Sequence, residues 1–179
     1  MDFAIVLQPN EKLSSALRQV RRSPDGGTRS LNHTRYGPLI DQPVVVSVET
    51  KPEGENLQEA QTQLAVWVAA HLTRLQELLQ ERGAKNDGLP WLPLLLVQGP
   101  QWFFLFASRT AEGTTASLPS VSHTTFVSST NIRQDVWTRI EFGDASTRFG
   151  VFRIVSGLQL LLHWAETRYR PWSETQATP

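Results

Sequence analysis

Short apolar runs and longer stretches with helical spacing alternate along this chain. The short runs are rich in β-branched residues and are closed by proline, glycine or asparagine, which is typical of strands. They predict strands at Asp2–Leu7, Pro43–Lys51, Leu92–Val97 and Trp102–Ala107. Because Gly99 and Pro100 form a turn signal between the last two runs, these two strands are expected to form a hairpin.

Helical spacing is clearest in Asn56–Arg82, where apolar residues recur every three or four positions and Gly83 offers a C-cap. A shorter helix is expected at Glu11–Arg22. A third helix is expected to begin at the N-cap candidates Ser146–Thr147 and to continue to about Tyr169. The chain therefore combines strands with three helices.

The remaining segments give weaker signals. Arg21–Leu39 is predicted to be a surface excursion because proline and glycines interrupt it. Residues 122–129 form a candidate edge strand, Asn131–Gly143 favours neither helix nor strand, and residues 173–179 are expected to be a flexible tail. The order of elements predicts one α/β (α+β) domain over residues 1–172, with a mixed central sheet flanked by helices.

Composition narrows the functional classes. The formal net charge of the 179 residues is zero, so overall charge does not indicate a nucleic-acid binder. The chain has no cysteine, which excludes disulfides, thiolate catalysis and zinc–thiolate sites. No signal peptide or membrane span is apparent, and we therefore expect an intracellular protein of the cytoplasm or nucleus that is not secreted and does not enter a membrane.

A charged pair ends the strongest predicted strand. Side chains alternate along a strand, so Glu49 and Lys51 share one face while the valines at 44, 46 and 48 share the other. A carboxylate and an ammonium at the end of a buried strand lose solvation, which a metal ion or a phosphate would restore. A Glu-x-Lys triplet by itself is weak evidence, because strand ends are commonly just solvated.

Two further residues join this hypothesis. Asp2 opens the first strand, and if that strand pairs with the one that carries Glu49, the two carboxylates converge on a space suited to Mg²⁺. Alternatively, Asp2 is only a turn residue at a strand end. Gln63 lies near the start of the long helix, where it would hold substrate or orient Lys51, or would be simply a polar residue on the helix shoulder. Trp67, together with His71 and Arg74, follows it at helical spacing.

Arginines and aromatic residues offer a second, less specific signal. Fourteen arginines outnumber three lysines, and a local group lies in or beside the excursion: Arg18, Arg21, Arg22, Arg29 and Arg35. These arginines would meet nucleic-acid phosphates, or form a solvated loop. The four histidines lack close metal-ligand spacing, which argues against a histidine-zinc site, although the loop could bring His33 near the charged pair. Most aromatic residues are better explained by core packing than by base stacking.

An ordered series of short motifs covers almost the whole chain, and in order they are "DFAIVL", "SLNHTRYGPL", "PVVVSVETK", "EAQTQLAVWVAAHL", "WLPLLLVQGPQWFFLFA" and "FGVFRIVSGLQLLLHWAETRYRPW". This series resembles a fungal family of PD-(D/E)XK nuclease-like domain proteins. Each motif is short, but their order and the combined Asn-His-Thr, Glu-Thr-Lys and Gln-x-x-x-Trp signals make the resemblance fairly specific.

The resemblance implies a restriction-endonuclease-like fold and a nuclease that uses Mg²⁺ or Mn²⁺. Asp2 corresponds to the superfamily's metal-binding aspartate, Glu49 and Lys51 to its (D/E)-x-K pair, and Gln63 to a helix glutamine found in the branch related to exonuclease subunits. The Thr50 carbonyl would complete the metal ligands. The superfamily normally places a helix and a strand before the aspartate, so the resemblance implies an N-terminally shortened fold with an exposed sheet edge.

Three functional hypotheses follow. The first is an Mg²⁺-dependent phosphodiesterase, and the second is a catalytically inactive nuclease-like scaffold used for binding or in another cellular or biosynthetic role. The third is a homo-oligomer in which the open sheet edge pairs with a second chain.

Overall fold

The structure, a computed structural model, describes residues 1–21, 30–81, 88–111, 124–127 and 132–177. In these residues six strands form one sheet: β1 (Phe3–Val6), β2 (Val44–Lys51), β3 (Leu92–Gln98), β4 (Gln101–Ala111), β5 (Thr124–Val127) and β6 (Ile132–Asp144). The helical elements are α1 (Glu11–Arg21), η1 (Gly37–Leu39), α2 (Leu57–Glu81), α3 (Arg148–Trp164), η3 (Ala165–Tyr169) and α4 (Arg170–Ala177).

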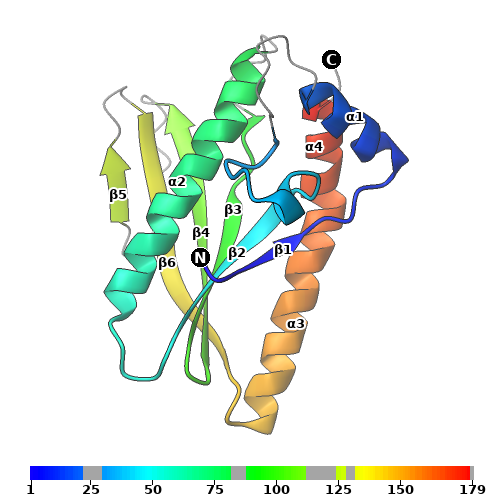
Figure 1. Cartoon of the computed structure of the whole chain (residues 1–179). Helices are drawn as coiled ribbons and strands as arrows, with labels where there is room; N and C mark the ends of the chain where they lie inside the picture. Colours follow the sequence, from blue (N-terminus) through cyan, green and yellow to red (C-terminus); the bar gives the residue numbers. More distant parts are fainter. Residues whose placement is uncertain (22–29, 82–87, 112–123, 128–131, 178–179) are drawn as a thin grey trace.

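The sheet is mixed, with the strand order β1-β2-β3-β4-β6-β5. Only β2 and β3 are parallel, and α2 is the crossover that joins them, because parallel neighbours cannot be linked by a tight turn. The other pairs are antiparallel. Figure 1 shows α2 in front of the sheet, while α3 and α4 run past the β1 edge. This arrangement confirms the predicted mixed sheet flanked by helices.

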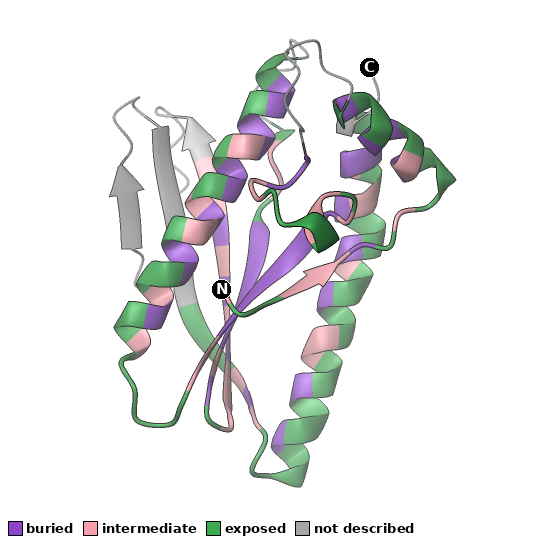
Figure 2. Cartoon of the chain, viewed as in Figure 1, coloured by how far each residue is buried: buried purple, intermediate pink, exposed green. Residues whose placement is uncertain are grey.

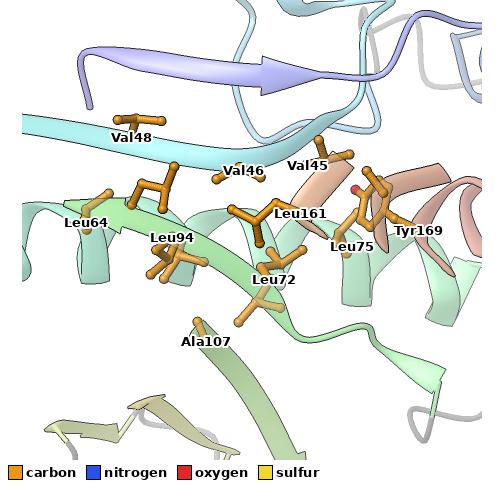
Figure 3. Packing of buried hydrophobic residues seen from close by; sticks show 14 of the residues in the cluster. Val45, Val46, Val48, Leu64, Leu72, Leu75, Leu94, Ala107, Leu161 and Tyr169 are labelled. Atoms are coloured by element: carbon orange, nitrogen blue, oxygen red, sulfur yellow. The ribbon is translucent and has the colours of Figure 1, made fainter. Parts of the chain in front are cut away.

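The centre of the sheet is buried on both faces. Every residue from Val44 to Glu49 is buried, and Figure 2 shows the same for most of β3. Figure 3 shows side chains of β2 among those of α2 and α3, with Val45, Leu72 and Leu161 in one cluster. The face of β2 that carries Glu49 is therefore covered, whereas alternation alone required only the valine face to be core.

Two segments differ from the sequence prediction. The undecided segment after residue 131 forms β6, because its backbone pairs with β4 along most of its length. The predicted tail is wrong at residues 173–177, which continue α4. Ser173 is fully buried there, and the Glu174 carboxylate accepts a hydrogen bond from Asn10 (2.9 Å) at the start of α1. Packing against α1 thus orders a segment whose own sequence is polar.

The predicted surface excursion is also only partly correct. Its residues 22–29 lie outside the described part, but Ser30, Leu31 and Asn32 are buried. Asn32 donates through Nδ2 to two backbone carbonyls, and its Oδ1 accepts from the Val44 N–H (2.9 Å). These bonds attach the segment to the start of β2.

In the described part of the chain, no helix combines the length and apolar character needed to cross a membrane.

Candidate functional site

The predicted pairing of the first strand with the strand that carries Glu49 is confirmed. Phe3 lies opposite Val48, and the Asp2 N–H donates to the Val48 carbonyl (3.0 Å). Figure 1 accordingly shows the N-terminus of the chain beside β2. Asp2 therefore lies next to the last three residues of β2, which include Glu49.

Glu49 is a buried carboxylate with a cation beside each oxygen. It is 3% exposed, and the Lys51 ammonium lies 3.6 Å from its Oε1. The Met1 α-ammonium lies 2.7 Å from Oε2. Even so, Oε2 is buried and accepts no hydrogen bond of normal geometry within the described part. The two ammonium groups offset the cost of burying this carboxylate, and a metal ion at Oε2 would replace or join the Met1 ammonium.

Asp2 differs from Glu49 in being exposed and hydrogen-bonded. Its Oδ2 accepts from the Thr50 hydroxyl (2.7 Å) and from the Thr50 N–H (2.9 Å). These two bonds hold the pKa of Asp2 below its ordinary value, because both stabilise the ionised form, and the bond from the Thr50 hydroxyl contributes most. The carboxylate is therefore charged, and since both bonds use Oδ2, Oδ1 remains for another ligand.

Lys51 is held where β2 ends. Its side chain is only 17% exposed, and its carbonyl accepts from the Gly99 N–H (3.0 Å) in the β3–β4 turn. Gly99 has a φ of 52°, and a Cβ there would lie 3.0 Å from Glu53, so glycine suits the turn in both respects. The hairpin thus fixes the end of β2.

A comparison with family models agrees with this geometry. The model described as the PD-(D/E)XK nuclease superfamily matches residues 1–170. The chain belongs to this superfamily. A search of curated proteins and a search of solved structures each returned no match. The family membership and the fold are thus established, and the nuclease-like core carries Glu-Thr-Lys at the end of β2.

The superfamily resemblance predicted that Gln63 belongs to the site. In the described part, however, the hydrogen bond of Gln63 is to Glu59 and not to the charged pair. Gln63 is exposed on α2, and its Nε2 donates to Glu59 Oε1 (3.3 Å) one turn earlier. In the described part, the hydrogen bonds of Gln63 do not include one to Glu49 or Lys51. Its role stays a hypothesis.

The donor set fits a hard divalent cation. Among the described residues, no group of three or more His, Cys, Asp or Glu side chains lies together. The candidate ligands are instead the carboxylates of Asp2 and Glu49 and the backbone carbonyl of Thr50, which follows Glu49 on β2. Oxygen ligands of this number suit Mg²⁺ or Mn²⁺, which keep several waters, better than zinc. The buried Glu49 carboxylate, which has the Lys51 and Met1 ammonium groups beside it, is the observation that favours a cation here.

The arginine group predicted to meet nucleic acid is divided in the structure. Arg18 and Arg21 lie on α1 rather than on a loop, and Arg21 donates to both Asp41 carboxylate oxygens (2.9 Å each). Arg35 is exposed, as is Arg18. Arg22 and Arg29 lie outside the described residues. The charge of Arg21 is thus balanced by Asp41, which sequence reasoning did not pair with it.

Sequence reasoning also missed a cluster between α2 and the segment at residues 30–33. The spacing of Trp67, His71 and Arg74 placed them on neighbouring helix faces, but no local signal connected them to His33. The structure brings His33 to within 4.1 Å of Trp67 and 5.3 Å of His71, measured between ring centroids.

Proposed function

We propose that this protein is a divalent-metal-dependent phosphodiesterase that hydrolyses nucleic acid. The observation that carries the proposal is the buried Glu49 carboxylate, with the Lys51 ammonium at 3.6 Å and Asp2 at the start of the neighbouring strand. A charged pair buried at a strand end is costly for stability alone, and such sites are commonly functional.

Asp2, Glu49 and the Thr50 carbonyl would hold Mg²⁺ or Mn²⁺. Such an ion, when bound, supplies a water of lowered pKa and a positive charge against the phosphoryl oxygens. The protein contributes placement, because the pairing of β1 with β2 brings Asp2 to the end of the strand that carries Glu49. The Thr50 bonds to Asp2 restrain that carboxylate before any ligand arrives.

Lys51 would act on the reacting groups directly. Its ammonium has three donors, of which one faces Glu49, so the others remain for the nucleophilic water and a phosphoryl oxygen. Partial burial strengthens this interaction, because less solvent screens it. Gln63, exposed on α2, would contact the substrate through its amide. The exposed Arg18 and Arg35 would meet more distant phosphates.

A nuclease assay tests the proposal. Wild type, Lys51→Met and Glu49→Gln are compared on single-stranded and duplex DNA and RNA, with Mg²⁺ or Mn²⁺. Lys12→Met is the matched control, because the Lys12 ammonium is exposed and pairs with Glu174 (3.0 Å) on α4. We expect cleavage by wild type and Lys12→Met, and a loss of about 100-fold or more in the two site variants. Equal cleavage by wild type and Lys51→Met would refute the assignment.

One observation favours a second candidate, a noncatalytic nuclease-like scaffold. Asp2 already serves the fold, because its carboxylate ties β1 to Thr50 on β2. Calorimetric titration with Mn²⁺ separates the two functions. Binding that Glu49→Gln abolishes supports the metal-dependent enzyme, whereas wild type that binds no Mn²⁺ and cleaves none of the substrates supports the scaffold.

A further inference from the structure

Within the described part of the chain, five buried nitrogen atoms on α2 and the neighbouring segment at residues 30–33 have no hydrogen-bond partner. They are Nδ1 and Nε2 of His33, Nε1 of Trp67, Nε2 of His71 and Nη2 of Arg74. Unpaired buried polar atoms are rare in folded proteins, and each costs about 1–3 kcal/mol. Five in one place therefore indicate a missing partner.

Tertiary contacts bring these groups together. The His33 ring lies edge-on to Trp67 at 4.1 Å and tilted against His71 at 5.3 Å, between centroids. Trp67, His71 and Arg74 follow one another at helical spacings of four and three, so they share one side of α2. Arg74 reaches the same segment, because its Nε donates to the Ser30 carbonyl (2.9 Å).

The chemistry of the five atoms selects an acceptor. The indole and guanidinium N–H groups can only donate, and each neutral imidazole also has one N–H. The Arg74 charge disfavours a bound cation. Its ion pairs with Glu77 and Glu81 use Nη1, which leaves Nη2 for another partner. An oxyanion can accept several donors at once, and it gains from the charge of Arg74.

The electrostatic state of the two histidines is consistent with an anion. Burial lowers the pKa of His71 to about 3, with a smaller contribution from His33, and burial lowers the pKa of His33 to about 4. Both rings are therefore neutral at pH 7 in the protein alone. A neighbouring negative charge would favour their protonated, doubly donating form.

We propose that His33, Trp67, His71 and Arg74 form a binding site for one small oxyanion of the phosphate class. The site uses none of Asp2, Glu49 or Lys51, so it is independent of the proposed catalytic function. The phosphate would come from free inorganic phosphate or from the backbone of a nucleic acid. Both sources present the same tetrahedral oxygens to the nitrogen donors.

Indole resonances in ¹H–¹⁵N NMR spectra report on this site directly. The chain has six tryptophans, and Trp67→Phe assigns the Trp67 signal because it removes the indole N–H while keeping an aromatic ring. Inorganic phosphate is titrated against chloride at equal ionic strength. We expect a saturable shift of the Trp67 signal. The Trp172 signal is the internal control, because its Nε1 already donates to the Gly88 carbonyl, and it should not move.

Variants separate this site from other phosphate contacts. Arg74→Leu and His71→Leu should each weaken phosphate binding about tenfold or more, since each removes a donor to a charged acceptor. Lys12→Met, which replaces an exposed side chain paired with Glu174, should show the same phosphate titration at the Trp67 signal as wild type. Where a variant is unstable, the melting temperature replaces the spectrum. Phosphate should raise it in wild type, and less in Trp67→Phe.

A second titration with a short single-stranded oligonucleotide distinguishes the sources. A Trp67 shift with inorganic phosphate assigns the site to the free anion, and a shift with the oligonucleotide alone assigns it to a nucleic-acid phosphate. Either result supports the site. No Trp67 shift with either ligand, or an equal shift with chloride, would overturn it and would indicate that water satisfies these nitrogens.

Discussion

Lowering the pH from 7 to 5 should destabilise this protein through two buried imidazoles. Burial lowers the pKa of His71 to about 3 and that of His33 to about 4. In the unfolded chain both side chains titrate near pH 6.5. The unfolded state therefore binds more protons than the folded state between about pH 4 and 6.5. Stability is fully present above pH 6.5 and is lost as the pH falls through this window.

The magnitude follows from the protonation equilibria. At pH 5 an imidazole with a pKa of 6.5 is about 97% protonated, and binding that proton stabilises the unfolded state by RT ln 32, about 2 kcal/mol. His71 is 1% exposed, so the full amount applies to it. His33 is only partly buried, and solvent screening reduces its share to about 1 kcal/mol. The expected loss is about 3 kcal/mol, against a typical total of about 5–15 kcal/mol.

Urea unfolding at pH 7 and pH 5, in buffers without phosphate, measures this loss. His71→Leu should remove about 2 kcal/mol of the pH dependence, whatever its effect on stability at pH 7. His163→Leu is the matched control, because His163 is exposed on α3, and it should leave the dependence unchanged. An unfolding free energy that is the same at both pH values would show that these imidazoles are not buried as neutral groups.

Two further substitutions test the fold around the sites. Gly150→Ala should cost about 3 kcal/mol or more, because its Cβ would lie 2.0 Å from the Asp144 carbonyl. The control Gly37→Ala has nothing within 4 Å and should change stability by less than about 0.5 kcal/mol, so an equal effect of the two in thermal unfolding would contradict this account. Asn32→Ala should cost about 2–4 kcal/mol in urea unfolding, since three backbone groups lose their partner, and a cost near zero would mean that water replaces the amide.

Local patterns were sufficient for much of the fold. Apolar runs predicted β1 to β4, and helical spacing predicted α1, α2 and α3, because each pattern reflects which side of an element faces the core. They failed where order depends on a distant partner. β6 is a strand because β4 lies beside it, and Ser173 is buried because α4 packs on α1. Neither partner is visible in the local sequence.

In the candidate site, too, local sequence patterns predicted some contacts and only the tertiary structure showed the others. Strand alternation placed Glu49 beside Lys51, and the 3.6 Å ion pair confirms that proximity. The sequence could only make the contact with Asp2 conditional on strand pairing, and it could not foresee that Thr50 would hold the Asp2 carboxylate. For Gln63 the superfamily resemblance supplied a role, whereas the structure shows a bond to Glu59.

By itself, then, the sequence determined which residues share a strand face or a helix face, and through its ordered motifs it determined the superfamily. Only the tertiary structure decided which charges are buried and which groups from distant segments meet. Periodicity acts over a few residues, whereas the desolvation of Glu49 depends on layers packed on both faces of β2. The contact of His33 with His71 likewise depends on a segment held to β2 by Asn32.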